Sequence, residues 1–339
     1  MTAPRAVVFG LAGPSLKPDE RRFFRATDPL GFILFARNIE TPDQVRALTA
    51  SLRETIGRAD APILIDQEGG RVQRLRPPHW RSAPPAARFG DAFARDPDQA
   101  KEAARLNHRL IAADLAALGI TVDCAPVLDV PVLGAHDVIG DRAFARSPAV
   151  VAELGRAAVA GLLAGGVIPV VKHIPGHGRA FADSHRELPK VVAALAELEA
   201  TDFAPFKALS DAPWAMTAHV LYAALDPALP ATQSKAVIGG IVRGAIGFAG
   251  VLVSDDLGMS ALAGGFRERA GACLRAGCDV VLHCSGEMAE MRAVADGSSP
   301  LSKAAAGRVA AAEAGRRKSL EPFDAAEGRL RLDALLAGT

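Results

Sequence analysis

The sequence predicts a single-domain α/β protein with the (β/α)₈ architecture of a TIM barrel. About eight short apolar runs rich in β-branched residues alternate with alanine-rich stretches of helical periodicity. The apolar runs are continuous, which indicates strands buried on both faces, as in a parallel sheet covered by helices. A count near eight favours a closed barrel over an open, doubly wound sheet.

The strands and helices alternate along the whole chain. We expect strands at residues 6–10, 31–37, 61–66, 119–130, 167–173, 214–220, 250–256 and 279–284. We expect the main helices at residues 41–56, 96–118, 147–164, 195–210, 234–247 and 259–276. Thr41 and Ser147 each precede a proline, which predicts an N-cap residue followed by proline at the first helical position. The Ala/Arg-rich tail from about residue 300 is expected to form helices outside the barrel, within one domain of residues 1–339.

The charge balance and hydropathy exclude several classes of function. The 39 basic residues nearly balance the 38 acidic ones, which argues against a nucleic-acid partner. No apolar stretch approaches the roughly 18–20 uncharged residues of a membrane span, and Pro, Gly and charge interrupt the N-terminal segment too often for a signal peptide. We therefore expect a cytoplasmic monomer that does not associate with membranes.

Cysteine spacing and glycine motifs give no sign of a cofactor. Cys124, Cys273, Cys278 and Cys284 lie in apolar segments without a CxxC pair, so we expect buried free thiols and no disulfide framework or zinc ribbon. No GxGxxG follows the first strand and no GxxxxGK[ST] occurs, which weakens nucleotide-binding alternatives. We expect no cofactor.

Ionisable residues cluster where the predicted strands end. A barrel enzyme carries its chemistry at the carboxyl ends of its strands, so such residues should meet at one mouth. In chain order they are Asp66, Glu68, Arg71, Arg74, Asp129, Asp141, Arg142, Lys172, His173, His219, Asp255 and Asp256.

The segment 174–185 after the fifth predicted strand combines glycines with His177, Asp183 and His185, and so with proton-transfer groups. It resembles a catalytic lid that is mobile without substrate and closes over it. The alternative is a loop without a catalytic role, exposed to solvent, in which Asp183 and Ser184 cap a turn.

Two other chemistries remain open from the residues alone. His173, His177 and His185 with Asp183 offer ordinary zinc ligands, but the usual HxH or HExxH spacing is missing, so we expect no metal. Lys172 at a strand end could form a Schiff base. The adjacent histidine and the arginines and carboxylates around it fit a hydroxyl-rich substrate better.

Six motifs occur in order between residues 32 and 259: IDQEGGRVQRL (65–75), GDRAF (140–144), KHIPGHG (172–178), DSH (183–185), MTAHV (216–220) and VSDDLGM (253–259). Together they resemble glycoside hydrolase family 3, and within it the single-domain β-N-acetylhexosaminidases of the NagZ type. Each motif alone is moderately specific, whereas six in register are strong evidence.

The resemblance implies a retaining, two-step displacement at the anomeric carbon of a terminal β-linked N-acetylglucosamine. It implies Asp255 as nucleophile, His185 as acid/base and Asp183 as the partner that orients this histidine. It also implies a role in cleaving 1,6-anhydro-muropeptides during peptidoglycan recycling. The implied substrate-binding residues are Asp66, Arg74, Arg142, Lys172 and His173.

The chemistry agrees with these roles. Glycoside cleavage needs a carboxylate to attack the sugar and a proton donor for the departing oxygen. A histidine, with an unperturbed pKa near 6.5, suits both donation and later removal of a proton near neutral pH. The aromatic content of 5% argues against the tryptophan platform of a polysaccharide binder.

Several rival interpretations keep the same site. Asp255 and Asp256 could be the pair of a substrate-assisted hexosaminidase, in which the acetamido oxygen attacks, or Asp255 could merely cap the next helix. A histidine acid/base would also tolerate phosphate, which permits an N-acetylglucosaminide phosphorylase. A catalytically inactive, muropeptide-binding barrel would use the same residues. His177 and His219 could bind substrate or only support the loop.

Overall fold

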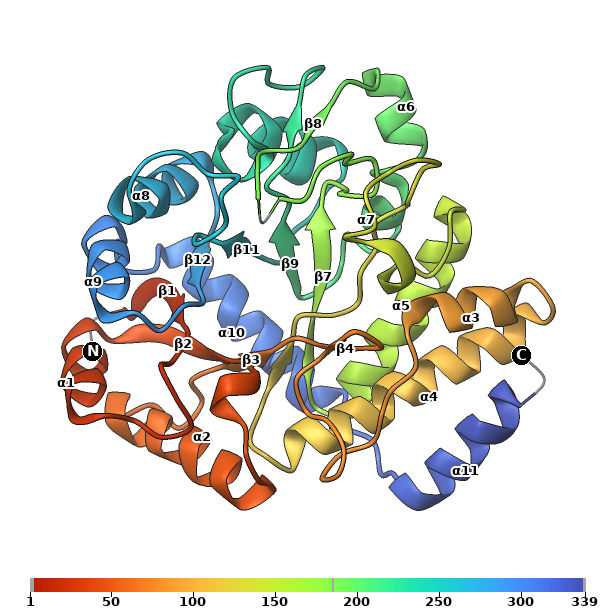
Figure 1. Ribbon diagram of the computed structural model, residues 1–339, viewed down its shortest axis with the longest axis horizontal. Helices are drawn as coiled ribbons and strands as arrows, with labels where there is room; N and C mark the ends of the chain where they lie inside the picture. The colour runs from red at the N-terminus through yellow and green to blue at the C-terminus, as the bar shows by residue number, and fades with distance from the viewer. Residues whose placement is uncertain (1–2, 185, 338–339) are drawn as a thin grey trace.

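The computed structural model describes residues 3–184 and 186–337, and within them eight parallel strands close into a barrel (Figure 1). The barrel strands are β1 (Arg5–Phe9), β2 (Pro29–Leu34), β3 (Ile63–Ile65), β6 (Val122–Asp123), β7 (Ile168–Ile174), β9 (Trp214–Thr217), β11 (Val251–Asp256) and β12 (Val280–His283). Each pairs with the next barrel strand along the chain, and β12 pairs with β1, with Val7 opposite Val281. The predicted fold class and all eight predicted strands are confirmed.

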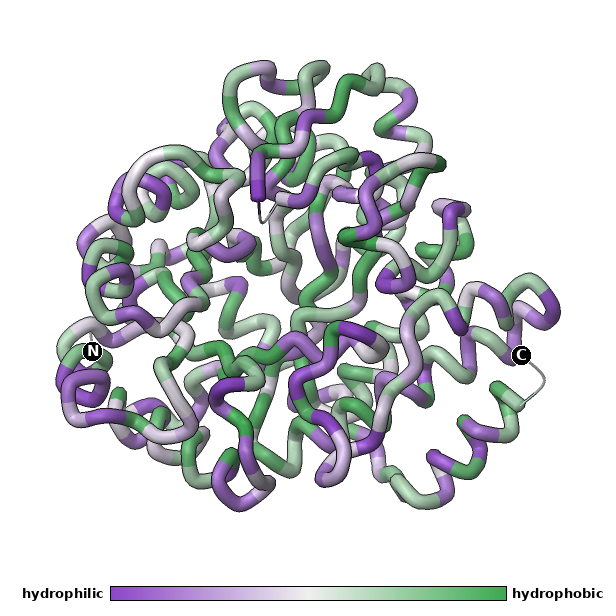
Figure 2. The backbone as a smooth tube through the Cα atoms, viewed as in Figure 1, coloured by the Kyte–Doolittle hydropathy of each residue, from purple (hydrophilic) through white to green (hydrophobic). Residues whose placement is uncertain are grey.

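Burial on both faces explains why the strands read as continuous apolar runs. Along β1, Ala6 and Val8 belong to the cluster that fills the barrel interior, whereas Val7 and Phe9 belong to the layer between barrel and helices. The side chains of a strand alternate between its two faces, so both sets must be apolar when both faces are covered. In Figure 2 the outer helices accordingly alternate between hydrophobic and hydrophilic residues, because only one side of each helix faces the barrel.

Helices surround the barrel and link its strands. They are α1 (Pro18–Thr27), η1 (Ala36–Asn38), α2 (Pro42–Ile56), α3 (Ala86–Phe93), α4 (Pro97–Ala116), η2 (Gly140–Arg142), α5 (Pro148–Ala164), α6 (Leu195–Ala200), α7 (Ala204–Ala208), η3 (Ala231–Gln233), the π-helix η4 (Val237–Ala245), α8 (Phe266–Ala276), α9 (Met288–Gly297), α10 (Lys303–Lys318) and α11 (Ala325–Leu336). The stretch expected as one helix at 195–210 is divided into α6 and α7. None of the described helices is long and apolar enough to cross a membrane.

The two predicted helix starts differ in their capping. At α2 the Thr41 hydroxyl accepts a hydrogen bond from the Gln44 backbone N–H, as an N-cap residue should. At α5 Ser147 stands at the N-cap position before Pro148, but its side chain makes no capping hydrogen bond. The proline position is therefore confirmed in both helices, and the capping interaction only at Thr41.

The C-terminal helices contact opposite parts of the molecule. Leu301, Ala305 and Ala312, in and just before α10, belong to the same buried cluster as the side chains of the barrel interior. In Figure 1 α10 crosses behind the strands, and α11 lies along α4 at the periphery. Helix α10 thus closes the end of the barrel away from the mouth, because the interior residues would otherwise meet water there.

A short hairpin carries the end of β3 across the barrel mouth. Its strands are β4 (Gln67–Gly69) and β5 (Val72–Gln73), which are antiparallel. A Cβ at Gly69, where φ is +99°, would lie 2.4 Å from the Pro84 carbonyl oxygen, so only glycine fits there. The buried Gln67 side chain accepts from the backbone N–H groups of Arg74 and Leu75. The hairpin therefore holds the residues on either side of it in fixed places. A second short pair, β8 (Lys190–Val191) with β10 (Leu221–Tyr222), lies outside the barrel.

Candidate active site

A cavity of about 390 Å³ lies at the carboxyl ends of the strands. It is lined by Ile33, Phe35, Arg37, Asp66, Glu68, Val72, Arg74, Val138, Ile139, Arg142, Lys172, His173, His177, Ser184, Met216, Asp255, Asp256, Met259, Leu282, Cys284 and Ser285. All five residues expected to bind substrate and the expected nucleophile Asp255 thus meet in one place. Asp183 does not line the cavity, and His185 lies outside the described residues.

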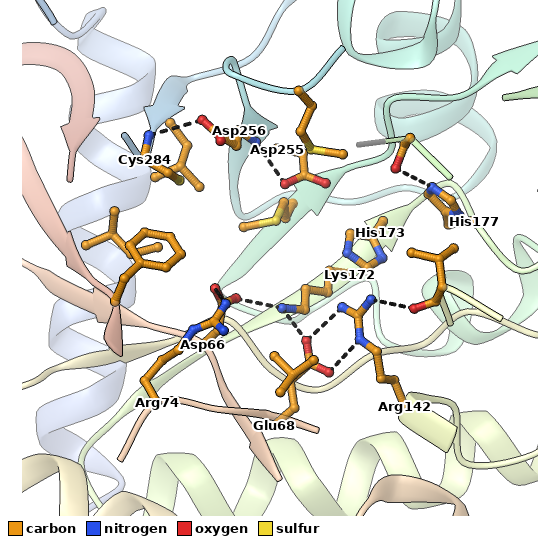
Figure 3. A pocket seen from close by; sticks show the side chains of 18 of the residues that line it. Asp66, Glu68, Arg74, Arg142, Lys172, His173, His177, Asp255, Asp256 and Cys284 are labelled. Carbon is orange, nitrogen blue, oxygen red and sulfur yellow. Dashed lines mark hydrogen bonds and ion pairs between the residues drawn. The ribbon is translucent and has the colours of Figure 1, made fainter. Parts of the chain in front are cut away.

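Lys172, on β7, lies at the centre of the cavity floor between two carboxylates (Figure 3). Its Nζ donates to Asp66 Oδ1 at 2.9 Å and lies 2.6 Å from Glu68 Oε1. Burial alone would lower the pKa of Lys172, but these two carboxylates raise it above its usual value. A lysine held as a cation is a poor nucleophile, so the geometry argues against the Schiff-base alternative.

Arg142, in η2, is fixed by a two-point contact with Glu68. Its Nε and Nη2 donate to the two oxygens of Glu68 at 2.9 and 2.8 Å, and its Nη1 donates to the Val138 carbonyl. Burial acts to raise the pKa of Glu68, but Lys172 and Arg142 hold it below its usual range. Glu68 therefore anchors two expected substrate-binding residues, a role that we did not assign to it from the sequence.

Asp66 follows β3 and is shared between two cations. Its second oxygen, Oδ2, accepts from Arg74 Nη2 at 3.0 Å. Burial acts to raise the pKa of Asp66, but Lys172 and Arg74 hold it well below its usual range, so it remains a carboxylate. Arg74 Nε is buried and has no hydrogen-bond partner among the described residues. A carboxylate acceptor and a guanidinium group thus lie side by side in the cavity wall.

His173 follows Lys172 and is oriented by the fully buried Asp129. Its Nδ1 lies 2.7 Å from Asp129 Oδ2, and its backbone N–H donates to Oδ1 of the same carboxylate. This contact fixes the ring and leaves Nε2 for other partners. The pKa of Asp129 is below its usual range because the two nearby histidines outweigh its burial. Asp129 was noted in the sequence as a strand-end acid, but its function as the support of His173 was missed.

Asp255 lies near the end of β11, and its contacts differ from those of Asp66 and Glu68. Its Oδ1 accepts the Asp256 backbone N–H at 2.8 Å, and among the described residues it has no ion-pair partner within 4.0 Å. Burial acts to raise the pKa of Asp255, but His173 and His219 lower it below its usual value. The result is an ionised carboxylate in the cavity wall without an ion pair to any residue of the described ranges 3–184 and 186–337.

Residues 18–312, a range that contains all six motifs, match the family model described as the Glycosyl hydrolase family 3 N terminal domain. The chain belongs to glycoside hydrolase family 3. A Beta-hexosaminidase of Xanthomonas euvesicatoria is 39% identical over 341 residues, which cover 98% of this chain and 95% of that protein. A Beta-hexosaminidase of Alkalilimnicola ehrlichii is 44% identical over 283 residues, or 82% of this chain and 80% of that one.

Solved structures agree with these relatives. NagZ from Neisseria gonorrhoeae in complex with N-trifluoroacetyl-D-glucosamine has a TM-score of 0.87 and 34% identity, and the match covers 99% of both chains. The resemblance drawn from the six motifs is thereby confirmed. This family 3 chain is a glycoside hydrolase of the β-N-acetylhexosaminidase type.

Asp256, the second aspartate of the family 3 VSDDLGM motif, accepts hydrogen bonds from the backbone. Asp256 Oδ1 accepts from the backbone N–H groups of Gly258 and Cys284, both at 3.0 Å. It thereby joins the turn after β11 to the end of β12. Cys284 is partly exposed at the cavity, whereas we expected all four cysteines to be buried; the other three are.

His219 also contacts the end of β11. Its Nδ1 lies 2.7 Å from the Thr232 hydroxyl and its Nε2 lies 3.1 Å from the Asp256 carbonyl oxygen. Because burial lowers its pKa, the ring is neutral near pH 7, and Nε2–H must then be the donor to the carbonyl. Both ring nitrogens are occupied, so His219 orients the strand that carries Asp255.

Two of the four residues weighed as zinc ligands, His173 and His177, make other contacts. His173 is paired with Asp129, and His177 Nε2 lies 3.0 Å from the Ser184 hydroxyl. The part of the chain that the structure describes contains no group of three His, Cys, Asp or Glu residues placed to hold a metal ion.

Proposed function

We propose that this enzyme is a retaining β-N-acetylglucosaminidase that removes a terminal, non-reducing β-linked N-acetylglucosamine through a covalent glycosyl-enzyme on Asp255. The main support for this proposal is that the carboxylates of the cavity differ in their contacts. Asp66 and Glu68 are held in ion pairs, and Asp256 caps backbone amides. Asp255 is ionised and free of such contacts among the described residues, which is the state that attack on a sugar carbon requires.

The proton donor must come from another residue type. A general acid near neutral pH needs a raised pKa if it is a carboxyl group, yet the pKa values of Asp66, Glu68 and Asp255 are all lowered. We therefore assign the acid/base to His185, which follows the cavity-lining Ser184 directly, and assign Asp183 to orienting it. His177 is a poor alternative, because burial lowers its pKa to about 4 and it is therefore unprotonated near pH 7.

The floor of the cavity would hold the sugar. We propose that Asp66, Arg142, Lys172 and His173 bind its hydroxyl groups, with Arg74 beside them. Bonds to charged partners are the stronger kind, and here they come from groups already fixed by one another. Such a floor spends little free energy on reorganisation when the substrate arrives.

The substrate is proposed to be short. The cavity is about 390 Å³ and Phe35 is its single Phe, Tyr or Trp among the described residues, which suits one terminal sugar better than an extended polysaccharide. The N-trifluoroacetyl-D-glucosamine in the neisserial neighbour supports an N-acylated glucosamine at this position. We propose 1,6-anhydro-muropeptides of peptidoglycan recycling as the natural substrates, cleaved in the cytoplasm by a monomer.

The covalent route is favoured over substrate assistance, because Asp256 is held by backbone amides and is poorly placed to orient an acetamido group. Incubation with a 2-fluoro sugar bearing a good leaving group should give a stable adduct, and mass spectrometry of the peptides should locate it on Asp255. Strong inhibition by a thiazoline without any adduct would establish the substrate-assisted route instead.

A further inference from the structure

A side-chain hydrogen bond joins the two ends of the loop segment 177–184, which carries the first two residues of the DSH motif. His177 Nε2 lies 3.0 Å from the Ser184 Oγ, and both residues are 3% exposed (Figure 3). The two residues are seven positions apart. Because both residues line the cavity, the two ends of the segment 177–184 lie at the cavity wall.

The other contacts of His177 lead into the sugar-binding floor. Its backbone N–H donates to Asp129 Oδ1 at 2.6 Å, and the other oxygen of Asp129 holds the ring of His173. The rings of His173 and His177 also pack edge to face, with centroids 5.6 Å apart. His177 thus contacts the support of a sugar-binding histidine with its backbone and the catalytic loop with its side chain.

Ser184 is held from a second side as well. Its carbonyl oxygen accepts the Ala261 backbone N–H at 3.3 Å, and Ala261 lies in the segment that follows Asp255 and Asp256. The middle of the loop is tied to the chain beyond Asp129, since Val132 N–H donates to the Gly178 carbonyl oxygen. Ser184 is consequently the point where the loop, the floor and the nucleophile-bearing segment meet.

We propose that His177 is a positioning residue that acts through Ser184 to set the acid/base group of the following residue against the glycosidic oxygen. This inference rests on the proposed function, in which His185 transfers the proton. A neutral imidazole has one N–H and one acceptor nitrogen, so it can hold the serine hydroxyl in either tautomer without taking part in proton transfer itself.

This role predicts a selective defect. A displaced proton donor harms glycosides whose leaving oxygen needs protonation and spares those with acidic aryl leaving groups. A purely structural defect would reduce the amount of folded enzyme and lower every rate by the same factor. The dependence of kcat/KM on leaving-group acidity separates the two, because kcat/KM reports only the steps up to loss of the leaving group.

The test compares Ser184→Ala, His177→Phe and His177→Gln on aryl N-acetylglucosaminides of graded leaving-group acidity and on a disaccharide. Ser184→Ala and His177→Phe should lose about tenfold or more kcat/KM on the disaccharide relative to the most activated aryl glycoside, a fraction of the full general-acid effect. His177→Gln, whose amide reaches the place of Nε2, should recover part of that loss.

His108→Phe is the matched control. His108 is also 3% exposed, burial lowers its pKa to about 4 as in His177, and its Nδ1 bonds a backbone carbonyl within α4, away from the cavity. We expect this variant to be less stable but to keep the leaving-group dependence of the parent enzyme.

His185→Ala serves as the reference for complete loss of the acid. If it is selective while Ser184→Ala and His177→Phe lower all glycosides equally or not at all, the positioning role is wrong and the proposed function stands. If His185→Ala itself shows no selectivity, the proposed acid/base is wrong and the positioning role is overturned with it.

Discussion

The cavity floor and the catalytic loop are held in different ways. The floor is an ion-pair network of Asp66, Glu68, Arg142 and Lys172, which links two barrel loops and a strand through charged contacts. The start of the loop also has charged partners, since the His177 backbone N–H donates to Asp129 and Arg179 pairs with Asp202. The Ser184 side chain at its other end is held by a hydrogen bond between neutral groups, the one with His177. Neutral hydrogen bonds stabilise by about 1 kcal/mol each, and charged ones by more. We therefore expect the floor to be the more rigid of the two and the Ser184 end of the loop to rearrange at lower cost.

The largest effect is expected at Asp255, which belongs to neither set. Asp255→Ala should lower turnover by roughly 10⁴-fold or more for every substrate, because no glycosyl-enzyme can form. Steady-state rates on an aryl glycoside and on a disaccharide measure it. Appreciable turnover of either substrate without the carboxylate would contradict its assignment as nucleophile.

The loop should show a smaller and selective effect. His185→Ala should lower kcat/KM for a disaccharide by about 10²–10⁴-fold, the usual contribution of a general acid. An activated aryl glycoside should still form the intermediate, which then accumulates, and azide should accelerate its turnover. Asp183→Ala should give a weaker form of the same defect. Equal losses on both substrates, with no rescue by azide, would assign the acid/base to another group.

A substitution in the floor, unlike one in the loop, should lower both the activity and the stability of the enzyme. Arg142→Ala removes the two-point partner of the buried Glu68, so we expect about 100-fold lower kcat/KM and a free energy of unfolding lower by up to about 3 kcal/mol. Urea denaturation and steady-state kinetics measure the two effects.

Arg156 provides the matched control, because it pairs with Asp211 at the surface, where their side chains are 46% and 71% exposed. Arg156→Ala should change stability by less than about 1 kcal/mol and leave the kinetics unaltered. An Arg142→Ala enzyme as active and stable as Arg156→Ala would exclude Arg142 from the site.

The smallest effect concerns pH and stability. Burial lowers the pKa of both His108 and His177 to about 4, from 6.5. Between these values the unfolded chain binds more protons than the folded one. Protonation of these histidines therefore favours the unfolded chain. The free energy of unfolding should be highest above about pH 6.5 and should fall as the pH is lowered towards about 4. Urea midpoints across this range should fall less steeply for His108→Phe than for the parent chain, and an unchanged slope would show that His108 is not held neutral.

The strands could be predicted because their environment is uniform. A strand buried on both faces has to be apolar throughout, which gives the short continuous apolar runs seen in the sequence. The short strands β4, β5, β8 and β10 were not predicted, since two or three residues show no periodicity. Helices α1, α3 and α9 were also not predicted from the sequence; Phe23 and Phe24 of α1, for instance, are buried only because the helix covers the barrel.

The sequence placed several of the cavity residues, but not the contacts between them. Motifs identified Asp66, Arg142 and Lys172, whereas the anchoring role of Glu68 depends on an arginine and a lysine that are 74 and about 104 positions away in the chain. Asp129 is similar, because only the fold brings it beside the rings of His173 and His177. Residue type indicates what a side chain can do, and the tertiary structure decides which partner it meets.

The pairing of β1 with β12 has a consequence for how the protein folds. Val7 and Val281 are neighbours in the sheet although almost the whole barrel separates them along the chain, so this ladder carries a large loop-closure entropy and should form late and slowly. Asp66 and Glu68 come from the early strands, and Lys172 and Asp255 from the later ones. Until the seam between β1 and β12 forms, both edge strands expose unpaired amides and carbonyls to intermolecular pairing. Refolding yield should therefore be most sensitive to protein concentration before the seam closes, and hydrolase activity should return only with that final step.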